Sequence, residues 1–323
     1  MKRANNKKSR NSGVKPKPFA LHRLIADAFP DKFDVRTIYH YTSSAVAQSL
    51  LNPKTAMLYC TWAKALNDEQ EYKIGLEYAL SHIAEVMNLD PEVLSEVKDV
   101  VAFYEKDDYR IPWVMSFSGE RDLLGQWRAY TNRIDGGYAV GFSFEKLESL
   151  VEKVVVLKAK SSRGKQRYIL HLLPCFYLDY SSEKAMKDLE AFFRIIFVDH
   201  FNQTVKGLID VKDPHQYAVA IASFICIFAS VVKHSAFSEE KEYRLMIQLL
   251  DPKYEKNVEI VGGKPRLRIS QKVTSRDVQE LVSELWVSPH GDQEVLRAVA
   301  HFLKVRFNPK LDVYYSNAPF NGR

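Results

Sequence analysis

The sequence contains few of the signals that mark common classes of protein. Its 323 residues include three cysteines, Cys60, Cys175 and Cys226, with no Cys-x-x-Cys pair and no metal-ligand spacing. This scarcity argues against a disulfide framework and a zinc module, and it favours buried thiols in a reducing compartment. The longest uncharged run, 217–232, is shorter than the roughly 20 residues that cross a bilayer. We therefore expect a buried central helix there, no membrane segment and a cytoplasmic protein.

Several catalytic motifs are also missing. The sequence has no Gly-x-Ser-x-Gly nucleophile elbow, no Gly-x-x-x-x-Gly-Lys-Ser/Thr loop and no Gly-x-Gly-x-x-Gly after a predicted strand. These absences argue against a serine hydrolase of that type, a P-loop nucleotidase and a Rossmann dinucleotide site. His40 has no His-x-His or His-x-x-x-His companion, so we expect no metal site.

The positive charge of the chain lies at its N-terminus. Residues 1–18 hold seven basic residues and no acid, which leaves 39 basic against 40 acidic residues in the rest. This tail is rich in Asn, Ser, Gly and Pro and is expected to be disordered. It could contact a nucleic-acid backbone or an anionic surface, or it could simply be a solubilising terminus. It is not a secretory signal, because no apolar stretch follows the charges.

Residues 19–323 are expected to form one α+β domain, because no internal segment has the composition of a linker. Helical periodicity and caps predict helices at 19–29, 45–51, 68–88, 90–104, 121–130, 182–206, 214–233 and 292–303. Alternation predicts strands at 36–41, 55–61, 110–118, 137–144, 154–158, 166–180, 242–250, 281–287 and 311–315, with a hairpin at 258–269. In the strand at 242–250 we expect Tyr243 to face the core and Glu242 and Arg244 to face the other way.

Three distant segments mix aromatic and polar residues at strand-like spacing. They are 38–43, 116–118 with Trp127 and Tyr130 downstream, and 237–244. An ordinary core strand would be aliphatic, and an ordinary surface would not interleave so many rings. The pattern therefore predicts a polar pocket assembled from separate strands.

Glu240-Lys241-Glu242 is the candidate with the clearest chemistry. An extended backbone would place both carboxylates on the same side, about 6–7 Å apart. One carboxylate beside a sugar can stabilise an oxocarbenium-like transition state while the other orients or deprotonates the nucleophile. The same pattern is also common at the solvated start of a strand.

The other candidates each have a structural alternative. His40 could hold a ribose hydroxyl or an amide, or it could be a hydrogen-bonded core residue. Ser116 and Ser118 share one strand face and could simply satisfy each other. Trp127 and Tyr130, three apart on a helix, could line a pocket or pack in the core.

In combination and order these segments resemble a bacterial family known as domain of unknown function 2971. The likeness runs from about 37 to 249. It rests on the motifs Tyr39-His40-Tyr41-Thr42-Ser43, Leu66-Asn67-Asp68-Glu69-Gln70-Glu71, Ser116-Phe117-Ser118, Trp127-Arg128-Ala129-Tyr130, Gly136-Gly137-Tyr138-Ala139-Val140-Gly141-Phe142 and Phe237-Ser238-Glu239-Glu240-Lys241-Glu242-Tyr243-Arg244.

More distantly, the chain resembles the ADP-ribosyltransferase fold. That resemblance implies a mixed, largely antiparallel split β-sheet core with flanking helices, plus a helical insert at about 182–233. It implies that Glu242 is the catalytic glutamate and that Glu240 is the accessory one. The residues that would bind the cofactor NAD are His40, Tyr41, Thr42, Ser116, Ser118, Trp127, Tyr130 and Arg244. The chain departs from the superfamily in having Phe117 between the two serines and in the length of its insert.

The resemblance implies NAD-dependent ADP-ribosyl transfer or NAD glycohydrolysis, with protein, nucleic acid or water as acceptor and a role such as a toxin or phage-defence effector. The alternative is a non-catalytic module of transferase-like fold that binds a nucleotide or a partner. A third hypothesis is a nucleic-acid binder that acts through residues 1–18.

Overall fold

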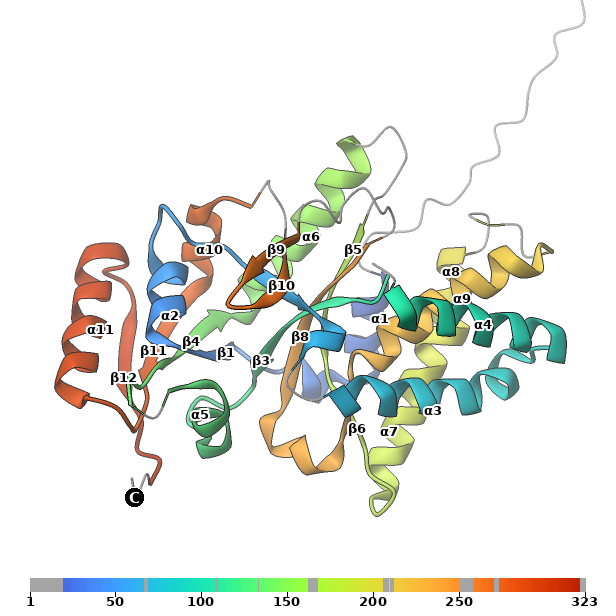
Figure 1. The fold of residues 1–323 in the computed structure, drawn as a ribbon, viewed down its shortest axis with the longest axis horizontal. Coiled ribbons are helices and arrows are strands. Elements are labelled where there is room, and N and C mark those ends of the chain that lie inside the picture. The colour runs from blue at the N-terminus through green and yellow to red at the C-terminus, as the bar shows by residue number, and fades with distance from the viewer. Residues whose placement is uncertain are drawn as a thin grey trace, which may run out of the picture.

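The computed structural model describes residues 20–66, 69–107, 110–132, 134–161, 168–205, 209, 212–249, 258–269 and 273–319. The predicted basic tail, 1–18, and the first residue of the helix predicted at 68–88 lie outside them. The described chain is a mixed α+β structure with a largely antiparallel sheet and flanking helices (Figure 1).

The helices are α1 (Ala20–Ala28), α2 (Ser44–Leu51), α3 (Glu69–Met87), α4 (Pro91–Asp107), α5 (Leu124–Tyr130), α6 (Phe144–Ser161), α7 (Glu183–Arg194), α8 (Phe201–Val205), α9 (Pro214–Ala229), α10 (Ser275–Leu281) and α11 (Gln293–Phe307). Shorter helical segments are η1 (Pro30–Lys32), η2 (Ala63–Ala65), η3 (Ile195–His200) and η4 (Ser235–Glu240).

The strands are β1 (Thr37–Thr42), β2 (Tyr59–Trp62), β3 (Trp113–Ser118), β4 (Tyr138–Ser143), β5 (Tyr168–Pro174), β6 (Phe176–Leu178), β7 (Val232–His234), β8 (Glu242–Leu249), β9 (Val258–Val261), β10 (Lys264–Arg268), β11 (Val282–Val287) and β12 (Asp312–Tyr315). Ten of them form one sheet in the order β12-β11-β4-β1-β3-β2-β10-β9, with β8 pairing β3 and β5. β6 and β7 form a separate parallel pair.

The sheet forks at β3. One edge of β3 pairs with β8 along its whole length, from Trp113 to Ser118. The other edge is shared, because β2 pairs at Val114 and β1 pairs only at Ser118. Alternate residues of an antiparallel strand turn their backbone N–H and C=O groups toward the same edge. The backbone of Ser116, which lies between Val114 and Ser118, therefore faces the opening of the fork.

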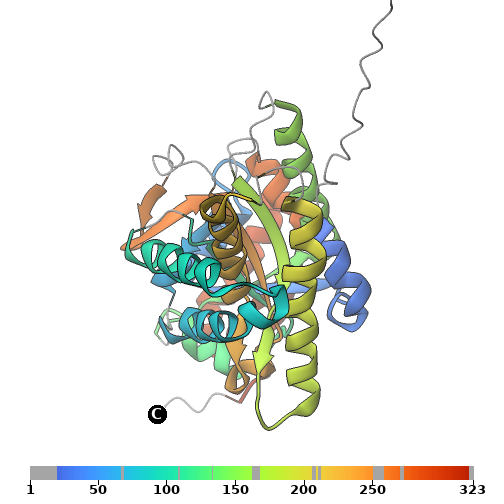
Figure 2. The ribbon, with the colours of Figure 1, turned by 90° about the vertical axis from the view of Figure 1, so that its right-hand side faces the viewer.

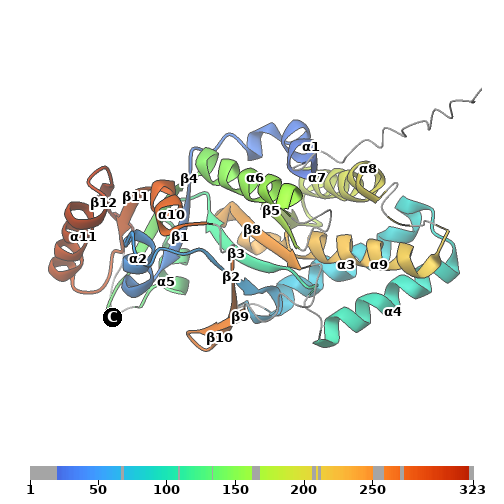
Figure 3. The same cartoon turned by 90° about the horizontal axis from the view of Figure 1, so that it is seen from above.

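Apolar side chains cover the two faces of the sheet in separate clusters. The first cluster includes Phe117, Tyr243 and Leu245 and packs against residues of α2, α6, α10 and α11. The second includes Val114 and Met246 and packs against α3, α4, α7 and α9. These helices gather at one end of the molecule, with α11 at the other end (Figures 1 and 3). Seen from the helical end, 183–205 stand as one long helix (Figure 2).

The helices of the second cluster change the prediction for residues 242–250. Every residue of β8, from Glu242 to Leu249, is buried, because α3 and α9 cover the face that carries Glu242, Arg244 and Gln248. The pattern correctly predicted which residues share a face. It did not show that the second face is also enclosed.

One predicted element is wrong in type, and another is wrong at its C-terminal end. The strand predicted at 154–158 lies inside α6, where the buried positions Phe144, Leu147, Val151 and Val154 continue a helical spacing into the valine run. The helix predicted at 214–233 ends at Ala229, and β7 follows. Within the predicted helix 182–206, a π-helical segment, Ile195–His200, interrupts the α-helix.

Gly75 lets α3 approach the end of α9 closely. A Cβ atom at this position would lie 2.7 Å from the Ala229 Cα and 2.8 Å from its carbonyl oxygen. Both partners are backbone atoms, which have little room to move. The contact fixes where Glu71, one turn earlier on α3, meets the chain that follows α9.

Gly75→Ala should lower the free energy of unfolding by about 1–3 kcal/mol, because overpacking outweighs the better helix propensity of alanine. Urea denaturation measures the change, and Glu77→Ala on the exposed side of α3 is the control, with a change within about 0.5 kcal/mol. A more stable Gly75→Ala protein would show that the two helices do not meet this closely.

Candidate functional site

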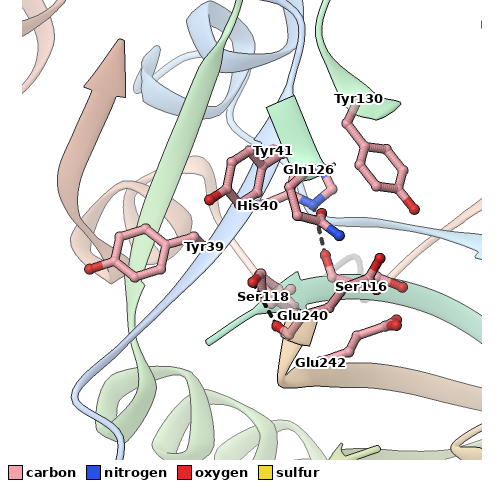
Figure 4. Close-up of a pocket in the computed structure, with 10 residues that line it drawn as sticks. Tyr39, His40, Tyr41, Ser116, Ser118, Gln126, Tyr130, Glu240 and Glu242 are labelled. Atoms are coloured by element: carbon pink, nitrogen blue, oxygen red, sulfur yellow. Dashed lines mark hydrogen bonds between the residues drawn. The ribbon is translucent and has the colours of Figure 1, made fainter. Parts of the chain in front are cut away.

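A cleft opens at the fork of the sheet, with about 330 Å³ of empty space, part of it continuous with solvent. It lies where β1, β3, α5 and the η4–β8 junction come together (Figure 4). The lining residues are Tyr39, His40, Tyr41, Ser116, Phe117, Ser118, Gln126, Tyr130, Glu240 and Glu242. Gln126 and Tyr130 face the carboxylates of Glu240 and Glu242 across this space, whereas the Tyr39 ring points away (Figure 4).

The cleft brings together seven of the ten predicted site residues. These are His40, Tyr41, Ser116, Ser118, Tyr130, Glu240 and Glu242. Thr42, Trp127 and Arg244 do not line it. Three segments distant in the sequence therefore converge, as the pattern of rings and polar residues predicts.

His40 closes the fork by bonding to the exposed backbone of β3. Its Nδ1 lies 2.9 Å from the Ser116 carbonyl oxygen. A carbonyl only accepts, so Nδ1 carries the proton and Nε2 keeps its lone pair in the neutral ring. Burial lowers the pKa of His40, although the bond to Ser116 opposes this shift. His40 is thus a neutral side chain with an acceptor nitrogen.

Ser118 anchors the loop that carries Glu240. Its hydroxyl donates to the Glu240 carbonyl oxygen at 2.7 Å, and the Gly119 N–H donates to the Lys241 carbonyl oxygen at 3.0 Å. The extended Glu-x-Glu geometry predicted for this loop is wrong. Glu240 ends the 3-10 segment η4, and Lys241 has a left-handed backbone with φ 43°.

The two glutamates still meet, because both bind Lys233 of β7. The Lys233 Nζ lies 2.8 Å from Glu240 Oε2, 2.5 Å from Glu242 Oε2 and 2.9 Å from Glu71 Oε1. The lysine side chain is 3% exposed. Three carboxylates from α3, η4 and β8 therefore surround one buried ammonium group.

Arg244 is the second cation of this cluster. Its Nε lies 2.6 Å from Glu242 Oε1, and its Nη2 lies 2.5 Å from Glu71 Oε2. Its Nη1 donates to the Ser230 carbonyl oxygen at 2.7 Å. Arg244 is only 3% exposed. It binds Glu71 and Glu242 on the buried side of the cluster, and its charge does not face the cleft.

The cations determine the ionisation of the glutamates. Burial alone would raise the pKa of Glu242, but Arg244 and Lys233 outweigh burial and lower it to about 2. The pKa of Lys233 is raised, because Glu242 and Glu71 outweigh the opposite effect of burial. Burial raises the pKa of Glu240, against the pull of Lys233. Glu242 is therefore a permanent anion, and Glu240 is the carboxylate that takes up a proton more readily.

With all five groups ionised, three carboxylates face two cations, and the cluster carries a net charge of −1. The effect reaches Tyr130, whose pKa rises to about 12 through burial and the charges of Glu242 and Glu240. Tyr130 is 42% exposed, so its ring is available at the mouth of the cleft.

Tyr41 and Trp127 support the cleft without offering a free polar group to it. The Tyr41 hydroxyl donates to the Glu120 carbonyl oxygen at 2.8 Å and accepts from the Leu123 N–H at 2.9 Å. Trp127 is fully buried, packs edge-on against Tyr41 and donates from Nε1 to Asp122. Trp127 therefore packs in the core, the structural alternative given for it, and it does not line the cleft as its neighbours Gln126 and Tyr130 do.

Sequence reasoning missed Glu71, Lys233 and Gln126. Glu71 lies near the start of the helix predicted at 68–88, where an acidic residue is expected from the helix dipole alone, and Gln126 belongs to no recognisable motif. Lys233 left a usable signal, because it is the first charge after the uncharged run 217–232. A single lysine at the end of so apolar a stretch indicates a buried partner.

The described residues also bear on metal binding and on membrane insertion. These residues contain no group of three or more His, Cys, Asp or Glu side chains arranged to hold a metal ion. Their helices include none with the length and hydrophobicity to cross a membrane.

Arg244→Met should lower the free energy of unfolding by about 3–5 kcal/mol, because it leaves two buried carboxylates with too few cations. The control is Arg23→Met in the exposed pair with Glu152, with an expected loss of about 1 kcal/mol at most. Urea denaturation at neutral pH compares the two, and equal losses would contradict the dominant role of the buried cluster.

The comparison with known proteins supports the resemblance to domain of unknown function 2971 over part of the predicted range, 37–249. A model for a family described as protein of unknown function (DUF2971) matches residues 126–245. This stretch runs from Gln126 to β8 and includes Tyr130, Lys233, Glu240 and Glu242, whereas His40 and Ser116 lie outside it. Neither a curated protein nor a solved structure gives a significant match. Over residues 126–245, the chain is similar to this family of unknown function.

Proposed function

We propose that the cleft binds NAD, breaks the bond between nicotinamide and ribose, and passes ADP-ribose to an acceptor or to water. The observation that carries this proposal is the convergence of His40, Ser116 and the two glutamates at the fork of the sheet. A forked, largely antiparallel sheet with polar residues at the fork supports the ADP-ribosyltransferase-like fold.

The charge of the site suits this reaction. The nicotinamide ring of NAD is cationic, and positive charge moves to the ribose as the C1′–N bond breaks and its electron pair leaves with nicotinamide. A preorganised anion beside the ribose stabilises that charge. The cluster provides a net negative charge, and the low pKa of Glu242, about 2, keeps this carboxylate ionised.

The side chains divide the work of binding. The acceptor Nε2 of His40 takes a hydrogen bond from a ribose hydroxyl, and the exposed Tyr130 ring stacks on nicotinamide. A carboxylate has about four lone-pair sites, and Arg244 and Lys233 make three contacts with Glu242. One site is left for the ribose 2′-hydroxyl.

Glu240 completes the transfer. One of its oxygens, Oε2, is bound to Lys233, and the other is assigned to the acceptor. As the acceptor oxygen or nitrogen bonds to C1′, its proton passes to Glu240. The acceptor is a protein side chain, a nucleic acid or water. The empty space at the fork is partly continuous with solvent, so we assign only the nicotinamide end of NAD to it, with the rest of the molecule outside.

A non-catalytic binding module is the second candidate. It is favoured by the fact that both oxygens of Glu242 contact buried cations while its side chain is only 6% exposed. In that case the ion pairs of the cluster only stabilise the fold, and the cleft binds a nucleotide or a partner without turnover.

Glu242→Gln should reduce nicotinamide release from NAD by about 10²–10³, because it removes charge that stabilises the transition state. NAD binding, measured by calorimetry, should change little. The control is Glu239→Gln, an exposed neighbour outside the cleft, which should retain full turnover. Undiminished turnover in Glu242→Gln would refute the catalytic assignment, and NAD binding without release by the wild type would favour the binding module.

The pH dependence of kcat should show the ionisation of Glu240. As a proton acceptor it works only when ionised, and burial raises its pKa above the ordinary 4.5. Turnover should therefore fall as the pH drops through this raised pKa, at a higher pH than for an exposed glutamate. Glu240→Gln should remove this acid limb from the pH–rate profile of the residual activity, and an unchanged limb would contradict the role.

A further inference from the structure

Helix α11 has two apolar faces, of which only one is covered. Leu296, Ala300 and Leu303 are buried in the first core cluster. On the other side, Val295, Phe302 and Val305 are 56%, 66% and 61% exposed. Ala298 is exposed between them. We call Val295, Ala298, Phe302 and Val305 the outer stripe of α11.

The outer stripe has the spacing of a helix-packing seam. Its members follow each other at intervals of three, four and three residues, as positions a and d of a heptad do. A solvated helix face normally carries polar residues at these positions. The stripe therefore has the pattern of a surface that receives a second helix.

The strand beside α11 is also unpartnered on its outer side. β12 is a terminal strand of the sheet and pairs only with β11 in the part of the chain that the structure describes. Both β12 and α11 lie at the end of the molecule away from α4 (Figure 1). The strand, Asp312-Val313-Tyr314-Tyr315, has no lysine or proline of the kind that protects sheet edges. Tyr314 and Tyr315 are partly exposed there.

We propose that this end of the molecule binds a second copy of the same chain, giving a two-fold dimer through the outer stripe of α11 and the edge of β12. The inference does not depend on the proposed function. A two-fold contact uses the same surface on both copies. The surface must therefore be complementary to itself, and the sequence of α11 meets this condition in size and in charge.

Size complementarity appears when two copies of α11 pack antiparallel around residue 300. Val295 of one copy then lies level with Val305 of the other, and Ala298 lies level with Phe302. The largest side chain of the stripe thus faces the smallest. A parallel pairing would instead place the two Phe302 rings level with each other.

Charge favours the same orientation. The first turn of α11 is acidic, with Glu294 after the cap Asp292, and the last turn is basic, with Lys304 and Arg306. Antiparallel packing brings the acidic end of one helix near the basic end of the other, and it also opposes the two helix dipoles. The same two-fold operation aligns the β12 edges antiparallel, so that the two sheets can join.

Sedimentation velocity of the full chain, from about 1 μM to about 100 μM, tests the proposal. The wild type should shift from monomer to dimer. Phe302→Glu, which places two charges in the seam, should weaken the dimer at least tenfold. The matched control is Phe103→Glu on α4, which changes a similarly exposed ring, 64%, far from the stripe. It should leave the dimer intact.

Hydrogen exchange gives a second measurement on the unmodified protein. Amides of β12 should exchange more slowly at the high concentration than at the low one, while those of the exposed hairpin β9–β10 should not change. A wild type that stays monomeric, a dimer that survives Phe302→Glu, or equal loss of the dimer in both variants would each overturn the proposal. Circular dichroism of both variants, which should match that of the wild type, is the check that they are folded.

Discussion

The structure depends on the burial of two cations, Lys233 and Arg244, in an otherwise apolar layer. Removing a charge from water costs several kcal/mol unless opposite charges and hydrogen bonds replace the solvent. Each cation here therefore requires carboxylates at contact distance. Those carboxylates come from α3, from the loop after β7 and from β8, so the requirement fixes how these three elements meet.

A second set of contacts, at the fork of the sheet, keeps the cleft open beside the dense core. β1 and β2 share one edge of β3 and leave the Ser116 backbone uncovered between them. His40 satisfies its carbonyl, and Ser118 and Gly119 hold the Glu240 loop against the same strand. Side chains and the Glu240 segment therefore satisfy the polar groups of the fork, and neither β1 nor β2 pairs with Ser116. The space beside Ser116 stays open as the cleft.

The sequence allowed much of this arrangement to be predicted. Alternation identified β1, β3 and β8, and the convergence of His40, Ser116 and Glu242 followed from their mixed aromatic and polar character. The α6 error arose because a valine run favours a strand locally while packing of Phe144 and Leu147 continues the helix. The partners of Lys233 could not be predicted, because nothing in the sequence near a lysine shows which distant carboxylates surround it. The left-handed turn at Lys241, unusual for a residue other than glycine, was likewise hidden.

The five charged groups of the cluster divide into a neutral set of four and one additional carboxylate. Glu71 and Glu242 alone balance Lys233 and Arg244, so four of the five groups form a neutral set. Glu240 adds the fifth charge at the end of the 3-10 segment η4, and its side chain is 17% exposed, more than those of the other four. A rotation of this one side chain toward solvent would change the electrostatic potential of the cleft while the neutral set stayed in place. The site can therefore vary its electrostatic potential by breaking one ion pair, Lys233–Glu240, while the other four stay in place.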